Sequence, residues 1–517
     1  MSLNSEIFVD KSELLDVTNR YVNTQQRFMC VSRPRRFGKS MAADMLAAYY
    51  DCGDDTEELF EGLSISQCKS YRKHLNQYDV LKINMQEFLS RSDDVEGMLT
   101  LMQRRILSDL KQKYPEYVRE EDLVFAMQDV YSHTKRSFVI LIDEWDCLFR
   151  EYQQDQKAQK KYLDFLRAWL KDQDNVAFAY MTGILPIKKY GSHSALNMFT
   201  EYSMTEPGEL AAYFGFTENE VKNLCMEYGM DFEEAKAWYD GYGLITHKQD
   251  RDICYSMYSP KSVVEAMLRH KFGTYWNQTE TYEALKVYIQ MNMDGLKDAI
   301  VGMLAGESIR INTGTFSNDM TTFATRDDIL TLLVHLGYLA YDIDRKEVYI
   351  PNEEIRQEFV RAIKNGKRQE LVKAIERSDQ LLDATLHMDE ETVAEIIQEV
   401  HLSNTTPQFY NNEQALRSVV IMAYLSCIDH YMKFEELASG RGYSDILFIP
   451  TKDSKKPALI IELKWDKKAK KAIEQIEEKQ YVKSLEKFKY HGDVLLVGIS
   501  YQTKNERHDC KIKKIVV

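Results

Sequence analysis

The chain has 517 residues, of which 44% are hydrophobic and 29% charged, and its formal net charge is −14. This length exceeds what one hydrophobic core normally serves, so we expect about two to four domains. The composition is typical of soluble proteins, and the acidic balance argues against nucleic-acid binding over the whole surface. The eight cysteines are scattered without a CxxC pair, so they indicate neither a zinc site nor a disulfide framework.

The N-terminal sequence and the apolar runs bear on location. The opening run MSLNSEIFVDKS lacks the basic region and apolar core of a secretory signal. No apolar run approaches the roughly 20 residues that a membrane span needs. We therefore expect a cytoplasmic protein without a membrane segment.

A phosphate-binding loop is expected near residue 38. An apolar run at 27–31 predicts a strand, and the alanine-rich run at 41–48 predicts a helix. Between them, Gly38, Lys39 and Ser40 form a turn at a helix N-terminus, where backbone N–H groups and the helix dipole attract anions. Lys39 is expected to reach the β- and γ-phosphates of ATP, and the Ser40 hydroxyl to ligate Mg²⁺. A turn that binds no nucleotide is the alternative.

Three arginines precede this turn. The full phosphate-loop pattern has a glycine where Arg33 stands, so the motif is incomplete. Arg35 and Arg36, together with Arg33, are candidates for phosphate contacts, because a guanidinium fork suits phosphate geometry. Solvated loop charges are the alternative for all three.

Residues 1–204 alternate strand-like and helix-like runs. Continuous apolar runs at 80–85, 138–142 and 176–181 predict strands, and amphipathic stretches at 95–113 and 155–171 predict helices between them. This pattern indicates a parallel sheet that is buried on both faces. The first domain is therefore expected to be α/β.

Acidic residues follow the second of these apolar runs. Asp143 and Glu144 would lie at the carboxyl edge of the sheet, where ligands bind in open α/β folds. Asp143 is expected to hold Mg²⁺, directly or through water, and Glu144 to orient or deprotonate the attacking water. Thr182, at the tip of another strand, is a candidate γ-phosphate sensor. The alternatives are a capping Asp-Glu pair and an ordinary Thr-Gly turn.

The middle of the chain reads as mostly helical from 205 to 365. A helix pattern at 326–336, followed by two short strand patterns around a polar turn at 344–346, predicts the wing half of a winged-helix domain. Such a segment either binds DNA or serves as a lid, and we favour the lid. Residues 366–410 are expected to form a helical linker.

Several segments resemble the AAA-ATPase-like family of bacterial and archaeal proteins. They are FVDKSELL at 8–15, RPRRFGKS at 33–40, ILIDEWD at 140–146 and TGIL at 182–185, and later WYDGY at 238–242, TYW at 274–276 and IPNEE at 350–354. In that family the phosphate loop commonly lacks the leading glycine. The resemblance implies a P-loop NTPase parallel sheet, ATP binding by Lys39 and Ser40, and Mg²⁺ coordination through Asp143.

The last part of the chain, 411–517, predicts a small separate α/β domain. Strand patterns lie at 445–449, 458–463 and 494–499, and one helix is expected at 466–489, between the last two strands. Glu462 and Lys464 differ by two positions, so they project from one strand face, where Asp445 of the facing strand can meet them. Two carboxylates and the carbonyl of Leu463 make a hard oxygen site that suits Mg²⁺ or Mn²⁺. Lys464 would position or activate water there for attack on a phosphodiester.

This set resembles the core of the PD-(D/E)XK nuclease superfamily and implies a restriction-endonuclease-like fold. Asp445, Glu462 and Lys464 match its central motif, although Ser444 replaces the usual proline. Glu413, on a preceding helix, matches an additional acid that many members use at the metal. Gln475 matches a supporting glutamine, and Tyr481 is its loosely spaced companion.

Lysines follow the motif and offer a phosphate-tracking patch. A solvated helix face with interleaved acids is the alternative. The lysines are Lys467, Lys468, Lys470, Lys471, Lys483, Lys487 and Lys489.

The sequence thus predicts an ATPase joined to a metal-dependent deoxyribonuclease, whose ATP state gates the nuclease. ATP, Mg²⁺ or Mn²⁺ and DNA are the expected ligands. The oligomeric state is left open, and a homo-oligomer is one of the options. A nucleotide-dependent switch that binds nucleic acid or protein without cleaving is the second hypothesis. A helical interaction protein with a vestigial ATPase is the third.

Overall fold

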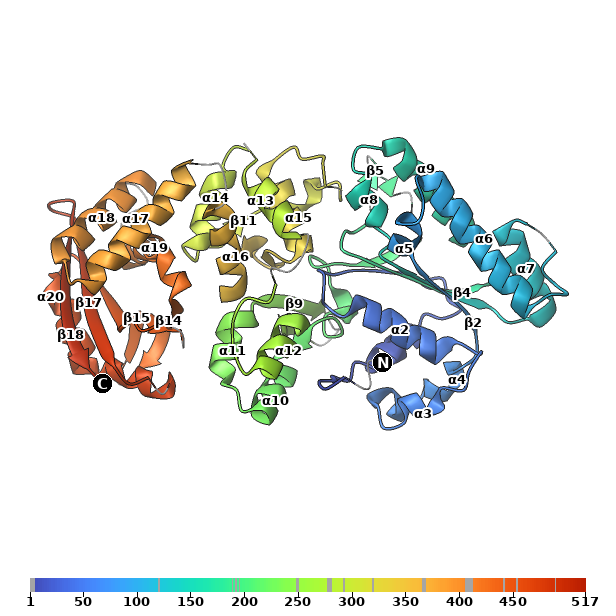
Figure 1. Ribbon diagram of the computed structural model, residues 1–517, viewed down its shortest axis with the longest axis horizontal. Coiled ribbons are helices and arrows are strands. Elements are labelled where there is room, and N and C mark those ends of the chain that lie inside the picture. The colour runs from blue at the N-terminus through green and yellow to red at the C-terminus, as the bar shows by residue number, and fades with distance from the viewer. Residues whose placement is uncertain are drawn as a thin grey trace. The chain divides into compact units, whose positions relative to one another are not determined.

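The computed structural model divides into two compact units (Figure 1). The first comprises Met1–Met230, Gly241–His270 and Ile311–Val348, and the second comprises Asp231–Asp240, Lys271–Arg310 and Tyr349–Val517. The described residues include no helix with the length and hydropathy of a membrane span. The described residues are 5–119, 121–187, 189–190, 193–194, 196–247, 251–276, 281–291, 293–318, 320–364, 369–404, 412–439, 442–451, 454–488 and 490–517.

A five-stranded parallel sheet forms the centre of the first unit. Its strand order is β2-β3-β4-β1-β7, so that β4 separates β1 from β3. Strands β1, β3 and β4 are buried along their whole length, as their continuous apolar sequences predict. The strands are β1 (Phe28–Ser32), β2 (Asp79–Asn84), β3 (Phe138–Asp143), β4 (Val176–Gly183) and β7 (Thr200–Tyr202).

Helices cover both faces of this sheet (Figure 1). On one face, α1 (Glu13–Asn19) and α2 (Lys39–Tyr50) enclose a core in which Leu46, Tyr49 and Tyr50 of α2 pack with apolar side chains of the strands. Figure 1 shows the longer helices α6 (Val95–Lys113) and α9 (Gln156–Leu170) on the other face. The expected parallel α/β arrangement is therefore confirmed, and both amphipathic stretches are helices.

The rest of the first unit contains helices and small hairpins. Strands β9 (Tyr242–His247) and β10 (Asp252–Tyr258) form an antiparallel pair, and α10 (Glu218–Tyr228) and α12 (Pro260–Arg269) pack together. The expected helix followed by two short strands is present as α15 (Arg326–Leu336), β12 (Ala340–Asp342) and β13 (Glu347–Tyr349).

The second unit begins with helices. The helix that follows the wing pattern, α16 (Glu353–Lys364), belongs to this unit together with α11 (Phe232–Tyr239), α13 (Thr281–Ile289) and α14 (Leu296–Leu304). Three of the segments with a family resemblance meet here. The Asn352 side chain donates to the Asp240 carbonyl oxygen at 2.8 Å. Glu354 accepts hydrogen bonds from the N–H groups of Tyr275 and Trp276. The middle region is thus mostly helical, as expected.

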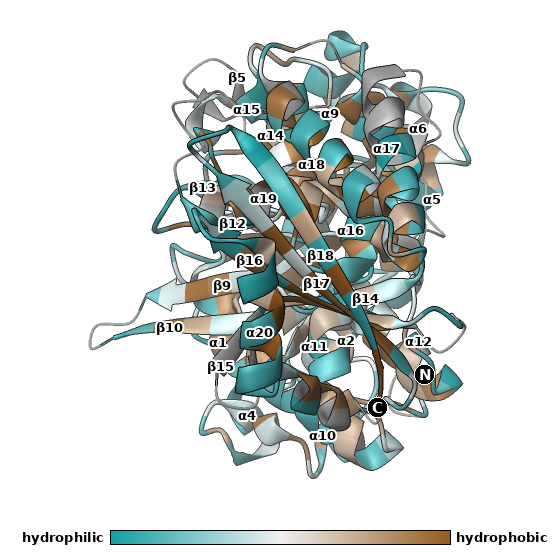
Figure 2. Ribbon diagram, turned by 90° about the vertical axis from the view of Figure 1, so that its left-hand side faces the viewer, coloured by the Kyte–Doolittle hydropathy of each residue, from teal (hydrophilic) through white to brown (hydrophobic). Residues whose placement is uncertain are grey.

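A mixed five-stranded sheet carries the C-terminal part of the second unit. Its order is β14-β15-β16-β17-β18, in which only β16 and β17 run parallel. Strand β17 is almost entirely buried, whereas Figure 2 shows β18 alternating between hydrophilic and hydrophobic residues. The strands are β14 (Tyr431–Ser439), β15 (Gly442–Pro450), β16 (Ala458–Trp465), β17 (Asp493–Gln502) and β18 (Arg507–Val516).

The crossover between β16 and β17 is not the single helix that the sequence predicts. It consists of α20 (Ala469–Lys479) and the 3₁₀ segment η6 (Tyr481–Phe488). The break falls at Gln480, whose φ of 56° places it in the left-handed region that ends a helix. The change of direction brings Tyr481 back toward α20, where its hydroxyl lies 3.1 Å from the Gln475 amide nitrogen.

A helix from the expected linker packs on the C-terminal sheet. It is α18 (Glu390–Asn404), which contacts β18, while α17 (Gln369–Leu386) packs against α18, and α19 (Glu413–Ala423) follows. The Gln398 side chain accepts a hydrogen bond from the His508 N–H at 3.2 Å, and Glu390 accepts one from the Ile512 N–H at 3.0 Å. The boundaries expected at 365 and 410 lie outside the described residues, so the four-part division stays a prediction.

Gly498 on β17 approaches α20 too closely for a side chain. A Cβ here would lie 2.5 Å from the Ala469 carbonyl oxygen and 2.9 Å from the Ala472 Cβ. We expect Gly498→Ala to lower the free energy of unfolding by about 1–3 kcal/mol, because the helix must move away. Urea denaturation of the full chain measures this loss. In the control Gly273→Ala the new Cβ would meet only the Tyr275 hydroxyl, at 4.0 Å, so an equal loss in both variants contradicts the packing argument.

Candidate functional site

The side chain of Lys39 bonds back to the loop between β1 and α2. Gly38 caps α2 with a φ of 88°, a left-handed conformation that favours glycine. The Lys39 ammonium donates to the carbonyl oxygens of Arg33 and Pro34, both at 2.9 Å. Burial lowers the pKa of Lys39, although nearby carboxylates, foremost that of Glu144, oppose this shift. The lysine is thus positioned beside the acids at the end of β3.

Arg33 has a different role from the one that its position suggests. Its side chain is fully buried, and Nη1 donates to the carbonyl oxygens of Ser32 and Tyr202 at 3.0 and 2.8 Å. The guanidinium also lies 5.6 Å from the ring centre of Phe214, and burial lowers its pKa to about 10. Arg33 therefore joins β1 to β7 inside the unit, and the expectation of a phosphate contact is not met.

The other loop residues remain accessible. Arg35 and Arg36 are half-buried, and Ser40 is exposed in the first turn of α2. Arg36 has a φ of 67°, so the loop turns sharply just before Phe37 and Gly38. Their roles toward phosphate and Mg²⁺ stay predictions.

Asp143 and Thr182 meet at the carboxyl edge of the sheet. Both side chains are buried, and the Asp143 Oδ1 accepts hydrogen bonds from the Thr182 hydroxyl and, at 3.0 Å, from the Glu144 N–H. The meeting follows from strand order, because β4 lies between β1 and β3 and places Thr182 level with Val31. Thr182 is thereby located between the phosphate loop and the acid.

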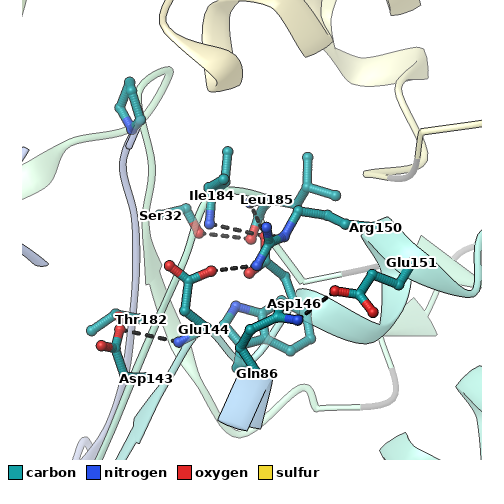
Figure 3. Close-up of polar contacts among 12 residues, drawn as sticks. Ser32, Gln86, Asp143, Glu144, Asp146, Arg150, Glu151, Thr182, Ile184 and Leu185 are labelled. Atoms are coloured by element: carbon teal, nitrogen blue, oxygen red, sulfur yellow. Dashed lines mark hydrogen bonds and ion pairs between the residues drawn. The ribbon is translucent and has the colours of Figure 1, made fainter. Parts of the chain in front are cut away.

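Glu144 is held by an arginine that the sequence did not single out (Figure 3). The Arg150 Nη2 forms an ion pair with the Glu144 Oε2, and the Arg150 Nε lies 3.7 Å from the Asp146 Oδ2. Arg150 comes from the short helix α8 (Cys147–Glu151), which directly follows the acidic turn. Asp146 and Arg150 are four residues apart, which is the spacing of a helical ion pair, so the pattern could have been read.

The second candidate site lies on the C-terminal sheet. The Asp445 Oδ2 on β15 accepts the Leu463 N–H of β16 at 2.8 Å. The Lys464 ammonium donates to the Glu462 Oε1 at 2.9 Å and to the Leu463 carbonyl oxygen at 2.7 Å. The Gln475 amide, from α20, donates to the same Glu462 oxygen. The structure thus brings Asp445, Glu462, Lys464 and Gln475 together.

Charges from α19 complete this cluster. The exposed Glu413 lies 3.6 Å from the Lys464 ammonium, and the Arg417 Nη2 lies 3.2 Å from the Asp445 Oδ1. Arg417 was not foreseen, although it is one helical turn beyond Glu413 and so projects from the same helix face. Burial raises the pKa of Glu462 to about 7, and the negative charge of Asp445 adds to the increase.

The oxygen atoms suit a divalent cation only in part. In the described part of the chain, no three His, Cys, Asp or Glu side chains gather as a ready metal centre. At the C-terminal site, however, the Glu462 Oε2 is buried without a hydrogen-bond partner among the described residues. This oxygen, Asp445 and the Leu463 carbonyl are the hard ligands that Mg²⁺ or Mn²⁺ prefers. The residues present therefore fit a metal bound by two carboxylates and one carbonyl.

The lysines beside this site do not form an uninterrupted basic patch. Lys467, Lys468, Lys470 and Lys471 are exposed, but Lys471 pairs with Glu474 at 2.7 Å. The side chain of Lys487 and the whole of Lys489 lie outside the described residues. Phosphate tracking by these lysines stays a prediction.

The two regions of the chain that hold the candidate sites match known protein families. Residues 1–192 match the family model of predicted AAA-ATPases, and residues 411–510 match that of the PD-(D/E)XK nuclease superfamily. The N-terminal region is therefore AAA-ATPase-like, and the C-terminal domain is of the PD-(D/E)XK nuclease superfamily.

One curated relative and one solved structure are also similar. An uncharacterized protein in the vnfD 5′ region of Azotobacter chroococcum mcd 1 is 26% identical over 267 residues, which cover 48% of this chain and 47% of the relative. The match thus spans about half of that relative. The Aeropyrum pernix ORC2 protein, in its ADPNP–ADP complexes, has a TM-score of 0.32 and 9% identity, covering 72% of this chain and 97% of that chain. A likeness this low carries no argument, so the fold rests on the strand order itself.

Removing the Thr182 hydroxyl tests the buried contact at the N-terminal site. In Thr182→Val the shape is kept, but the buried Asp143 Oδ1 loses the Thr182 hydroxyl as a donor and keeps the Glu144 N–H. We expect the free energy of unfolding to fall by about 1–3 kcal/mol, because a buried carboxylate oxygen loses a partner. Thermal denaturation of the full chain measures the change. Thr182→Ser keeps the donor and is expected to lose less, so equal losses would show that the hydroxyl is irrelevant.

Proposed function

We propose that this chain, which joins an AAA-ATPase-like region to a PD-(D/E)XK nuclease superfamily domain, is an ATP-hydrolysing protein with a metal-dependent DNA phosphodiesterase activity. The observation that carries the proposal is the presence of two complete sets of chemical groups in one chain. Lys39 lies near Asp143 and Glu144 in one unit, and Lys464 contacts Glu462 beside Asp445 in the other. The residues of each set belong to one unit.

The N-terminal site binds ATP in this proposal. Lys39 and the N–H groups of the Gly38 turn hold the phosphates, and Arg35 and Arg36 add contacts from the loop. Ser40 and Asp143 would hold Mg²⁺, whose charge neutralises the phosphate oxygens. The location of Thr182 between the loop and Asp143 supports its role as a γ-phosphate sensor.

Hydrolysis needs a group that takes a proton from water. Glu144 is that group: it accepts a proton while the water oxygen bonds to the γ-phosphorus. The bond from that phosphorus to the bridging oxygen breaks, which leaves ADP and inorganic phosphate. The partial exposure of Glu144 supports this role, because an attacking water must reach it.

The C-terminal site cleaves the phosphodiester. Asp445, Glu462 and the Leu463 carbonyl would hold Mg²⁺ or Mn²⁺, with Glu413 as an additional acid, and the ion would offset charge on the phosphate. Lys464 orients or activates the water, and its contact with Glu462 supports this role. Gln475 holds the Glu462 oxygen in place and is itself 3.1 Å from the Tyr481 hydroxyl.

Coupling, location and assembly complete the proposal. ATP binding or hydrolysis rearranges the middle region, which acts as a lid and gates the nuclease. The winged-helix-like segment is part of that lid. The protein acts in the cytoplasm, and a homo-oligomer remains compatible with the sequence.

A nucleotide-dependent switch that does not cleave is the second candidate. It is favoured by one observation, namely that Asp445 and Glu462 already have cationic partners in Arg417 and Lys464. A domain in which these pairs persist would bind nucleic acid or protein without taking up a metal. Cleavage and metal binding therefore separate the two candidates.

Loss of the Lys39 ammonium tests the ATPase. We expect Lys39→Ala to reduce ATP turnover at least about 100-fold, because the cation that meets the phosphates is gone. Release of inorganic phosphate from ATP and Mg²⁺ measures turnover. Lys111→Ala changes an exposed lysine of α6 and should keep the parental rate. Undiminished hydrolysis by Lys39→Ala would show that the phosphate loop is misassigned.

Loss of the Lys464 ammonium or the Asp445 carboxylate tests the nuclease. We expect Lys464→Ala and Asp445→Ala each to reduce cleavage of DNA about 100-fold or more, since each removes a group from the reacting site. Linear, circular and single-stranded DNA with Mg²⁺ or Mn²⁺ are the substrates, and circular dichroism checks folding. Lys504→Ala, in the exposed turn after β17, is the matched control. Parental cleavage by both variants would rule out the assignment.

A further inference from the structure

The Asp146 carboxylate is held in place by backbone hydrogen bonds next to the ion pair of Glu144 and Arg150. Its side chain is fully buried, and its Oδ2 accepts hydrogen bonds from the N–H groups of Ile184 and Leu185, both at 2.9 Å. These N–H groups follow β4, so the carboxylate is anchored to the same strand that carries Thr182. Figure 3 shows Glu144 and Asp146 close to Arg150.

The contact between Arg150 and Asp146 is only half formed. Within the described residues, the Arg150 Nε and the Asp146 Oδ1 are both buried and lack a hydrogen-bond partner. The Arg150 Nε is 3.7 Å from the Asp146 Oδ2, which is beyond a normal hydrogen bond. A guanidinium and a carboxylate form their strongest contact as a bidentate pair with two parallel hydrogen bonds, and here these two bonds are not formed. Buried polar atoms without partners are rare, so the arrangement favours a second position of the guanidinium.

A move of Arg150 toward Asp146 would release Glu144. A bidentate contact gives partners to the buried Arg150 Nε and Asp146 Oδ1 and keeps the largely buried guanidinium next to a carboxylate, so the move leaves neither charge unpaired. Glu144 has 24% of its side chain exposed, so water can solvate the freed carboxylate. While the ion pair lasts, by contrast, the Glu144 Oε2 is occupied by the guanidinium and does not accept a proton from water.

We propose that Arg150 is a positioning residue that exchanges between Glu144 and Asp146, and that ATP is hydrolysed only when Glu144 is released. The inference rests on ATP hydrolysis at the Lys39 loop, as proposed above, and adds the device that controls it. The proton of the attacking water passes to Glu144 in the released state, while Arg150 stays paired with Asp146. Nucleotide binding itself does not need the exchange, because Lys39 and the loop bind the phosphates.

Substitutions at the two partners predict opposite effects. Arg150→Gln removes the guanidinium that occupies Glu144, so kcat for ATP is expected to rise at least about threefold. Asp146→Asn weakens the second position and keeps Arg150 on Glu144, so kcat is expected to fall at least about tenfold, which corresponds to the loss of one charged partner. In both variants KM and the affinity for a fluorescent ATP analogue should stay within about threefold of the parent, since the substitutions leave Lys39 and the phosphate loop unchanged.

The double variant separates positioning from a structural role. In Arg150→Gln combined with Asp146→Asn there is no guanidinium that could stay paired with Glu144, so kcat should return to the value of Arg150→Gln. Two merely structural losses would instead add. Arg150→Lys is an independent test, because an ammonium still pairs with Glu144 but cannot form the bidentate pair, so kcat should fall. Arg91→Gln, an exposed arginine that pairs with Glu87 on the surface, is the control and should match the parent.

Each outcome decides the inference. A double variant as slow as Asp146→Asn, or Arg150→Gln with a kcat below that of the parent at unchanged nucleotide affinity, overturns it. If Arg150→Gln does not fold, the fall predicted for Arg150→Lys remains, and an unchanged kcat there overturns the inference. If the parent shows no turnover, or if Lys39→Ala keeps it, the ATPase proposal itself fails, and that result is distinguishable from a failure confined to Arg150.

Discussion

The parallel hydrogen bonding of β1, β4 and β3 is the constraint on which the N-terminal site depends. Parallel strands end at one edge of a sheet, so the loop after β1 and the acids after β3 meet there although they are far apart in sequence. Because β4 is inserted between them, its last residues fill the space and supply the Thr182 donor. The close approach is visible at Gly183, where a Cβ would lie 2.7 Å from the Trp145 indole nitrogen and 2.8 Å from the Asp146 Oδ1.

Both candidate sites pair an acid with a cation, partly buried at the first site and buried at the second. Glu144 pairs with Arg150 in the first unit, and Glu462 pairs with Lys464 in the second. An isolated charge in such a place would cost several kcal/mol, so the pairs are what makes the burial possible. In the first pair the guanidinium occupies the Glu144 oxygen that a proton would use, whereas in the second pair the Glu462 Oε2 has no hydrogen-bond partner among the described residues. The proposed chemistry at the first site therefore requires a change of partners, which connects activity to a small movement of the long Arg150 side chain.

The sequence predicted the elements, and which candidate residues lie together, better than the partners of those residues. Continuous apolar runs identified β3 and β4, and the spacing of Glu462 and Lys464 identified one strand face. Arg33 was misread because a sequence does not tell whether a loop arginine points outward or into the core, and here the Tyr202 carbonyl draws it inward. Helical spacing alone could have suggested Arg150 and Arg417 as neighbours of the acids. Their ion pairs with Glu144 and Asp445, however, are defined only by the folded arrangement. The break at Gln480 was not predicted, because a left-handed residue other than glycine leaves little trace in sequence.

The central claim is that ATP at the Lys39 loop controls phosphodiester cleavage at the Lys464 site. The most direct test measures the rate of DNA cleavage by the full chain in Mg²⁺, with and without ATP, for the parent and for Lys39→Ala. The account predicts that ATP changes the parental rate by at least about fivefold, the lower end of ordinary allosteric coupling, and leaves the rate of Lys39→Ala unchanged. A parental cleavage rate that is the same with and without ATP, or an equal response to ATP in both proteins, would contradict it.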